Sequence, residues 1–236
     1  MCRFSGSDLD IAANVARVRE RIGAAAARAG RCAEDIVLLA ASKTVDSDRI
    51  LLAARAGIAD FGENYVQEAR PKIARIGHGV RWHFVGHLQT NKAKQAVALF
   101  DIVQTVDRER LAVELDRRAH AAGRRLPVLL EVNTSGEQTK FGVAPEEALR
   151  LAEVVAALPA LELRGLMTMG RLGAGPEEAR PGFALLRRLS EELRRPLPAA
   201  NITWLSMGMS GDFEVAIEEG SNMVRVGTAI FGARPQ

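Results

Sequence analysis

The feature of this sequence that most constrains its fold is a regular alternation of short apolar runs with longer stretches of helical periodicity. Strands of a parallel sheet are buried on both faces, so they appear as continuous apolar runs, and each is followed by a crossover helix. The runs that predict strands are 37–43, 58–62, 80–85, 101–106, 127–132, 161–167, 201–205 and 223–226. Helices are predicted at 46–56, 67–76, 91–99, 108–122, 145–157, about 176–195 and 212–219, and a further helix that ends at Gly30 precedes the first strand.

Eight strand–helix units in a chain of 236 residues predict a closed (β/α)8 barrel, because parallel strands joined by right-handed helical crossovers close naturally at this number. No linker of low complexity interrupts the series, so we expect residues 1–236 to form a single domain with an extra N-terminal helix. The alternative is an open doubly wound sheet, which would usually show a G-x-G-x-x-G turn after its first strand. This chain has Ser42-Lys43-Thr44 at that point.

Composition argues against several classes of protein. The chain is 47% hydrophobic, which suffices for a large core, and its net charge of +3 is spread as Arg beside Glu and Asp along the predicted helices. Because there is no basic run and few residues are aromatic, a dedicated nucleic-acid surface is not expected. No apolar stretch has the length of a signal-peptide core or a membrane span, and Cys2 and Cys32 lack metal or redox spacing. We therefore expect a cytoplasmic protein with reduced thiols.

A lysine follows the first predicted strand. The run 37–43, VLLAASK, ends at Lys43, and lysine is a residue type that this chain otherwise seldom uses. In barrels and doubly wound sheets, chemistry collects at the carboxyl ends of strands. Partial desolvation there lowers the pKa of an amine and favours the neutral nucleophile that forms imines. The alternative is a lysine that extends to solvent, and this run alone does not distinguish the two.

The loops after the seventh and eighth predicted strands have the composition of an anion-binding site. They are 206–212, SMGMSGD, and 225–228, RVGT. Barrels commonly bind phosphate at this place, where small residues let backbone N–H groups approach an anion and hydroxyls complete the cradle. Ordinary turn chemistry is the alternative explanation for either loop. Two such loops, together with Lys43, favour a phosphorylated aldehyde held between them.

Other polar residues near the predicted strand ends are weaker candidates. His83 and His87 are four residues apart, but on a strand roughly 13 Å would separate them, so no metal site is expected. The stretches 63–65, ENY, and 88–92, LQTNK, could face a ligand or could cap helices. Lys140, in a polar loop after the fifth strand, is a second amine near the mouth of the predicted barrel.

Seven runs, in order along most of the chain, resemble the pyridoxal phosphate homeostasis proteins, which are relatives of the N-terminal barrel of alanine racemase. The fit is loosest at 173–179 and in the N-terminal helix. The resemblance implies a barrel of PLP fold type III that binds pyridoxal 5′-phosphate (PLP). The matching runs are AASKT at 40–44, FGENYVQE at 61–68, WHFVGHLQTNK at 82–92, VNTSGEQTKFG at 132–142, LRGLMTMG at 163–170, LSMGMSGDFEVAIEEGS at 205–221 and MVRVGTAIFGAR at 223–234.

The resemblance also implies roles for individual residues. Lys43 would form a Schiff base with PLP, and Arg225 would face the pyridine nitrogen. Asn64 and His83 would line the ring. The phosphate would lie against residues of the two glycine-containing loops, which are Ser206, Met207, Gly208, Gly227 and Thr228. No residue of this set is implied as catalytic.

Arg225 bears on whether such a site catalyses. PLP withdraws electrons best when its ring nitrogen is protonated, a state that an acidic partner favours. An arginine is cationic and donates a hydrogen bond, so it disfavours that protonation. Racemases of this barrel type also use a tyrosine from a second domain across a dimer, whereas this chain has a single tyrosine, Tyr65. We therefore expect a protein that holds PLP as a reversible Schiff base and supports vitamin B6 and amino-acid homeostasis, without strong catalysis of its own.

Two alternative functions stay open at this point. One is a PLP-dependent racemase acting on a small amino acid, and the other is a Schiff-base aldolase that works without a cofactor. The expected partners are PLP itself and PLP-dependent apoenzymes that would receive it, with neither nucleic acid nor membrane. The lack of a partner domain favours a monomer.

Overall fold

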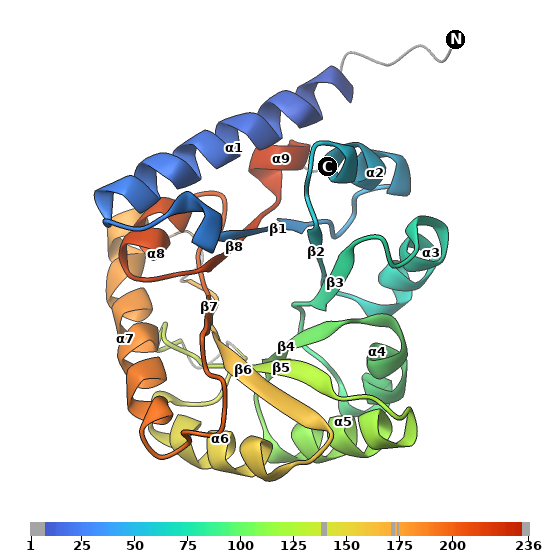
Figure 1. The fold of residues 1–236 in the computed structure, drawn as a ribbon, viewed down its shortest axis with the longest axis vertical. Helices are drawn as coiled ribbons and strands as arrows, with labels where there is room; N and C mark the ends of the chain where they lie inside the picture. Colours follow the sequence, from blue (N-terminus) through green and yellow to red (C-terminus); the bar gives the residue numbers. More distant parts are fainter. Residues whose placement is uncertain (1–7, 138–140, 171–172, 174, 233–236) are drawn as a thin grey trace.

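The computed structural model describes residues 8–137, 141–170, 173 and 175–232. Its eight parallel strands follow one another around a closed barrel in chain order, and β1 pairs with both β2 and β8 (Figure 1). The predicted (β/α)8 barrel is confirmed. The open doubly wound sheet is thereby excluded.

The strands are short and the helices lie outside them. The strands are β1 (Val37–Ala41), β2 (Asp60–Glu63), β3 (Arg81–Phe84), β4 (Ile102–Val106), β5 (Leu126–Glu131), β6 (Leu161–Met167), β7 (Trp204–Ser206) and β8 (Met223–Val226). The helices are α1 (Asp8–Arg28), α2 (Ser47–Arg55), α3 (Val66–Ile76), α4 (Ala93–Leu99), α5 (Glu109–Ala121), α6 (Ala148–Ala157), α7 (Pro176–Arg194), α8 (Phe213–Glu218) and α9 (Thr228–Phe231). Short 3-10 helices cover Ala33–Asp35, Thr90–Lys92 and Pro145–Glu147.

The first strand is shorter than predicted. β1 ends at Ala41, and Ser42 still donates its backbone N–H to the carbonyl of Gly62 at 2.9 Å. The chain then leaves the sheet at Lys43, because Thr44 adopts a left-handed backbone conformation with φ of +63°. Lys43 therefore lies on the turn above the barrel, at the carboxyl end of β1, and not on the strand itself.

The N-terminal helix closes a gap in the outer layer. The apolar stripe that predicted α1, formed by Ile11, Val15, Val18 and Ile22, is buried. It packs against α8, α9 and α2, and Figure 1 shows α1 lying along the side of the barrel next to β8 and β1. The sequence predicted no helix after the eighth strand, and α9 has only four residues. A helix that short cannot cover the barrel wall, so α1 takes over that part of the outer layer.

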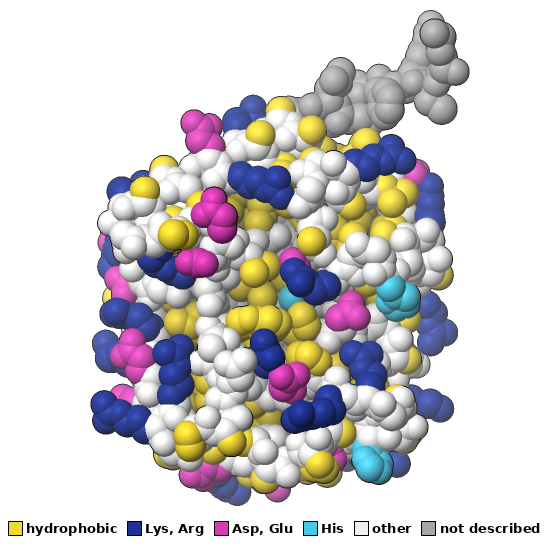
Figure 2. All heavy atoms as spheres, in the orientation of Figure 1, with side chains coloured by type: hydrophobic (Ala, Val, Ile, Leu, Met, Phe, Trp, Pro, Cys, Tyr) yellow, Lys and Arg dark blue, Asp and Glu magenta, His cyan; other side chains and the backbone are white. Residues whose placement is uncertain are grey.

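The surface carries charges of both signs. On the face shown in Figure 2, Lys and Arg side chains lie interspersed with Asp and Glu, and no field of one sign covers it. Ion pairs between helices contribute to this pattern, such as those of Glu218 with Arg28 at 2.9 Å and with Arg180 at 2.8 Å. None of the helices in the described ranges combines the length and the apolar character needed to cross a bilayer.

A glycine-to-alanine change tests the closeness of β6 and β7. Gly165 pairs with Trp204, and a Cβ at Gly165 would lie 1.9 Å from the carbonyl oxygen of Trp204. Because backbone must move to relieve this clash, we expect Gly165→Ala to lower the free energy of unfolding by about 1–3 kcal/mol or more. Gly23 in α1 is the matched control, since a Cβ there meets nothing within 4 Å. In urea unfolding, Gly23→Ala should be neutral or stabilising by about 0.5–1 kcal/mol, and equal effects at the two positions would contradict the packing described.

Candidate functional site

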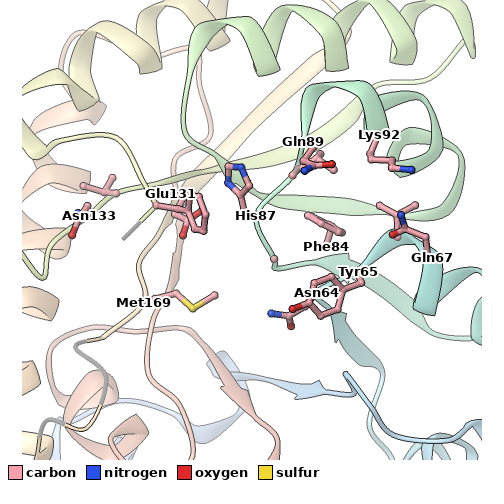
Figure 3. A pocket seen from close by; sticks show the side chains of 15 residues that line it. Asn64, Tyr65, Gln67, Phe84, His87, Gln89, Lys92, Glu131, Asn133 and Met169 are labelled. Carbon is pink, nitrogen blue, oxygen red and sulfur yellow. The ribbon is translucent and has the colours of Figure 1, made fainter. Parts of the chain in front are cut away.

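Two cavities open at the carboxyl ends of the strands. The smaller, of about 240 Å³, lies between the turn after β1 and the loops after β7 and β8, and its lining includes Lys43, Ser210, Arg225, Gly227 and Thr228. The larger, of about 630 Å³, lies over the ends of β2, β3, β5 and β6 (Figure 3). Carboxyl ends of strands are where barrels carry their sites, so both cavities are candidates.

The smaller cavity contains four of the residues predicted from the sequence. Lys43 reaches it from the turn after β1 and is half-buried. Arg225, Gly227 and Thr228 reach it from the end of β8 and the start of α9. The barrel thus brings an amine, a guanidinium and a glycine–threonine loop from opposite ends of the chain into one place, because β1 and β8 are neighbours.

A buried ion pair lies beneath Lys43. Lys72 on α3 donates to Glu63 Oε1 and to the backbone carbonyl of Ser42, both at 2.8 Å, and the hydroxyl of Ser42 donates to the same Glu63 oxygen at 2.6 Å. Burial raises the pKa of Glu63 in spite of the opposing effects of Lys72 and Ser42. This cluster fixes the backbone of Ser42, the residue before Lys43. The sequence analysis did not find it, although Lys72 falls on the inward face of its predicted helix.

The loops after β7 and β8 form a small cradle of backbone N–H groups. The N–H groups of Gly227 and Ala229 both donate to the hydroxyl of Ser210, at 3.3 and 3.4 Å. A Cβ at Gly227 would lie 3.2 Å from the carbonyl oxygen of Ala41, so a glycine keeps this turn close to β1. Two N–H groups that converge on one oxygen are suited to an anion.

Gly208 shapes the first of these loops. It has φ of +94°, and a Cβ there would lie 2.6 Å from the Cβ of Ala216. Glycine is therefore required by both conformation and space. Gly208 acts on the cradle through the path of the loop, since it is not among the residues that line the smaller cavity.

Two residues of the smaller cavity were missed by the sequence analysis. Ser210 belongs to the loop 206–212 that was singled out, but its hydroxyl was not chosen as a contact. Arg49 of α2 also lines the cavity and donates to the backbone carbonyl of Phe231. Its position in the first turn of the helix that follows Lys43 is the only signal that could have indicated it.

Arg225 is buried among neutral acceptors. Its Nη1 donates to the backbone carbonyl and to the hydroxyl of Ser206, and its Nη2 donates to the carbonyl of Thr168, each at 2.7 Å. Burial lowers the pKa of Arg225 to about 10, against the attraction of Glu131 and Asp212. The guanidinium is therefore charged at neutral pH and held in one orientation.

A chain of hydrogen bonds continues from Arg225 through the inside of the barrel. The hydroxyl of Ser206 donates to Gln104 Oε1 at 2.6 Å, and Gln104 Nε2 lies 2.8 Å from His83 Nδ1. An amide nitrogen can only donate, so Nδ1 accepts and the ring proton is on Nε2. His83 Nε2 then donates to Asp60 at 2.9 Å. The chain thus links Arg225 to a carboxylate at the opposite end of the barrel.

Asp60 anchors that far end. It accepts two hydrogen bonds from Arg81, both at 2.7 Å, in addition to the one from His83. Burial opposes ionisation of this carboxyl, but the bonds from His83 and Arg81 outweigh it and lower the pKa of Asp60 to about 2. Asp60 is therefore ionised at neutral pH.

The structure separates the remaining predicted residues from the smaller cavity. Asn64 lines the larger cavity. His83, Ser206 and Met207 are fully buried and line neither of the two cavities. The hydroxyl of Ser206 is engaged by Gln104 and Arg225. Roles of these residues as direct ligand contacts stay predictions.

The chain matches a known family model and is similar in sequence to proteins of known name. The family model for the alanine racemase N-terminal domain matches residues 10–235. A protein of Escherichia coli (strain K12) called pyridoxal phosphate homeostasis protein is 45% identical over 232 residues, which cover 95% of this chain and 97% of that protein.

Solved structures agree with this likeness. An unknown protein from Bifidobacterium adolescentis has a TM-score of 0.90 at 38% identity and covers 98% of both chains. PipY of Synechococcus elongatus PCC7942, in a structure with PLP bound, has a TM-score of 0.83 at 35% identity and covers 94% of this chain and 100% of PipY.

Removal of Lys72 tests the buried pair. Lys72→Met leaves the Glu63 carboxylate buried without its cation, so we expect a loss of about 3–5 kcal/mol in unfolding free energy at pH 8. The double variant Glu63→Gln/Lys72→Met removes both charges and should recover most of that loss. The pKa of Glu63, already raised by burial, rises further without Lys72, so the folded single variant takes up a proton that the unfolded chain does not hold. Its deficit relative to wild type should therefore shrink between pH 8 and pH 5 in urea unfolding, and a pH-independent deficit would contradict the pairing.

Proposed function

Because this chain belongs to the family of pyridoxal phosphate homeostasis proteins, as its sequence motifs predicted, we propose that it binds PLP in the smaller cavity as a reversible Schiff base on Lys43. The protein would hold this reactive aldehyde and so support vitamin B6 and amino-acid homeostasis. The observation that carries the proposal is that Lys43, Arg225, Gly227 and Thr228 line one cavity.

The residues of that cavity suit the three functional groups of PLP. An aldehyde requires an amine, which Lys43 supplies. A phosphate requires N–H donors without side-chain obstruction, and the N–H groups of Gly227 and Ala229 converge on the Ser210 hydroxyl beside Thr228. A pyridine nitrogen accepts a hydrogen bond, and Arg225 is a buried donor. PLP supplies electron withdrawal when it is bound in an enzyme.

Arg225 favours storage of PLP over catalysis. Its hydrogen bonds to Ser206 and Thr168 fix the guanidinium, and its charge persists at neutral pH. A fixed cation beside the ring nitrogen opposes protonation of that nitrogen and thereby weakens electron withdrawal. The tyrosine that a racemase would need is not in this cavity, since Tyr65 lines the larger one and is 57% exposed.

We also propose the domain organisation, cellular location, oligomeric state and partners of the protein. Residues 1–236 would form a single domain that works in the cytoplasm as a monomer. PLP-dependent apoenzymes would be its partners, and neither nucleic acid nor membrane would be required. Each of these statements rests on the sequence and the family.

Reductive trapping tests the covalent bond. Borohydride treatment of the PLP-loaded protein should fix one pyridoxyl group on the peptide that contains Lys43, read by peptide mass spectrometry. Lys43→Ala should abolish the label and the visible absorbance of the bound cofactor while the protein stays folded, because this half-exposed turn residue adds little packing. Lys94→Ala, at an exposed position of α4, is the matched control and should label as wild type does. A label found chiefly on Lys140, which lies outside the described residues, would contradict the assignment.

Hydrogen exchange tests the absence of strong catalysis. With PLP saturating, we expect the wild type to exchange the α-hydrogen of alanine with solvent deuterium slowly and to produce no racemic alanine over the same period, as followed by NMR and chiral chromatography. Arg225→Glu should bind PLP more weakly, and once its absorbance and circular dichroism show that it is folded and saturated with PLP, it should raise the exchange, since a carboxylate favours the protonated pyridine. The gain should be modest, because positioned acid–base groups typically supply about 10²–10⁴-fold and the cavity lacks a tyrosine. Rapid racemisation by wild type would replace the carrier proposal with a racemase.

A further inference from the structure

The larger cavity contains a buried carboxylate, one oxygen of which has no hydrogen-bond partner among the described residues. Glu131, at the end of β5, is 5% exposed and lines the cavity. Its Oε2 is buried and accepts no hydrogen bond within the described part of the chain. Buried carboxylates are ordinarily paired, because desolvation of an unpaired charge is costly. A cavity that ends on such a group is suited to a ligand that supplies the missing cation.

None of the charged groups described around Glu131 forms an ion pair with its carboxylate. Arg225 attracts Glu131, but its Nη groups donate to Ser206 and Thr168. Asp107 repels it. Burial and this repulsion raise the pKa of Glu131 to about 7, in spite of Arg225. Lys92 also lines the cavity, but Figure 3 shows it on the opposite side from Glu131.

Aromatic side chains line the way from the surface to Glu131. Phe141 and Tyr65 both line the cavity, and their exposed fractions are 56% and 57%. The ring of Phe141 stacks on His87 with centroids 3.8 Å apart and planes 17° apart, and Phe84 lies deeper. Figure 3 shows Phe84 and Tyr65 across the cavity from Glu131. Aromatic rings pack against apolar stems and attract cations at their faces.

We propose that the larger cavity binds a protonated primary amine carried on an unbranched apolar stem, the chemistry of a lysine side chain, with the ammonium at Glu131 and the stem between Tyr65 and Phe141. A carboxylate or phosphate in this place would be repelled by Glu131, beside which lies the further negative charge of Asp107, and is disfavoured. A branched or bulky neutral ligand would leave Glu131 unpaired. The site does not depend on the proposed function, because none of its lining residues belongs to the smaller cavity.

The test is a binding measurement on the full chain free of PLP, so that no imine can form. The probe is Nα-acetyl-L-lysine amide, and its neutral counterpart is Nα-acetyl-L-norleucine amide, which has the same stem without the ammonium. Calorimetry or ligand-observed NMR at millimolar concentrations should show the lysine probe binding at least about tenfold more tightly, as expected for a charge-assisted hydrogen bond. Equal binding of the two probes would overturn the proposal.

Variants assign the effect to the residues named. Glu131→Gln should weaken the lysine probe at least about tenfold and leave the norleucine probe unchanged. Glu153→Gln, on the exposed face of α6, is the matched control and should bind both probes as wild type does. Phe141→Ala changes an exposed side chain and should weaken the lysine probe by about two- to fivefold with an unchanged melting temperature. A wild-type affinity in Glu131→Gln would refute the site.

The pH dependence gives an independent readout. Affinity for the lysine probe should fall as the pH is lowered through about 7, because Glu131 then takes up a proton. The other charged groups that face this carboxylate are Asp107 and Arg225, and His87 and Lys92 lie in the cavity wall. Burial lowers the pKa of His87. The norleucine probe should show no such dependence, and an equal pH response of both probes would contradict the role of Glu131.

Two further measurements test the position of the ammonium on the ligand and whether Lys140 of this chain occupies the site. L-norleucine carries its ammonium on the α-carbon beside a carboxylate, so the proposal expects it to bind more weakly than the lysine probe, and tighter binding would overturn a site for an amine at the end of an apolar stem. Lys140→Met removes the chain's own lysine from the loop after β5. Binding of the lysine probe to Lys140→Met but not to wild type would mean that Lys140 itself occupies the place, which would overturn a site for an external amine.

Discussion

The arrangement of this barrel depends on the hydrogen-bond chain that starts at a buried arginine. Arg225 is charged and only 4% exposed, so most of its donors must find acceptors within the protein. Ser206 supplies two of them, and the chain then passes through Gln104 and His83 to Asp60. Each link is a donor matched to an acceptor, which leaves none of these buried groups unsatisfied. The barrel interior, usually a stack of aliphatic side chains, is here polar along the line from Arg225 to Asp60.

The same cation shapes the electrostatics of both cavities. Arg225 lines the smaller cavity, and its charge also attracts Glu131 in the wall of the larger one. The guanidinium of Arg225 thus contributes positive charge to the smaller cavity and, from the same position, partly stabilises the carboxylate of Glu131 in the larger cavity. Since Arg225 is already held by Ser206 and Thr168, Glu131 is stabilised only in part, and its pKa stays raised. The two cavities are therefore distinct in lining and opposite in the charge that each would accept.

Rigidity near Lys43 is consistent with a protein that holds a reactive aldehyde. The buried pair of Glu63 and Lys72 fixes the Ser42 carbonyl, and the left-handed Thr44 turns the chain immediately afterwards. Lys43 is thereby presented on a short, fixed turn between two restrained residues. Binding to such an amine costs little conformational entropy. Turnover would demand more, namely groups that move protons at the α-carbon, and the single tyrosine of the chain, Tyr65, lines the larger cavity instead.

The sequence by itself determined the eightfold alternation, the closed barrel, and the grouping of Lys43 with the loops that contain Gly227 and Thr228. These features follow from local patterns: apolar periodicity, glycine-rich turns, and the rule that carboxyl ends of parallel strands meet at one end. Only the tertiary structure decided that the hydroxyl of Ser206 and the ring of His83 point into the barrel and that Lys72 pairs with Glu63 next to Lys43. It also decided that Oε2 of Glu131 has no hydrogen-bond partner within the described residues. These outcomes depend on strand register and on which distant side chains meet across the barrel. A shift of one residue would reverse the direction of every side chain on a strand, and no pattern within a single segment specifies its neighbour's register.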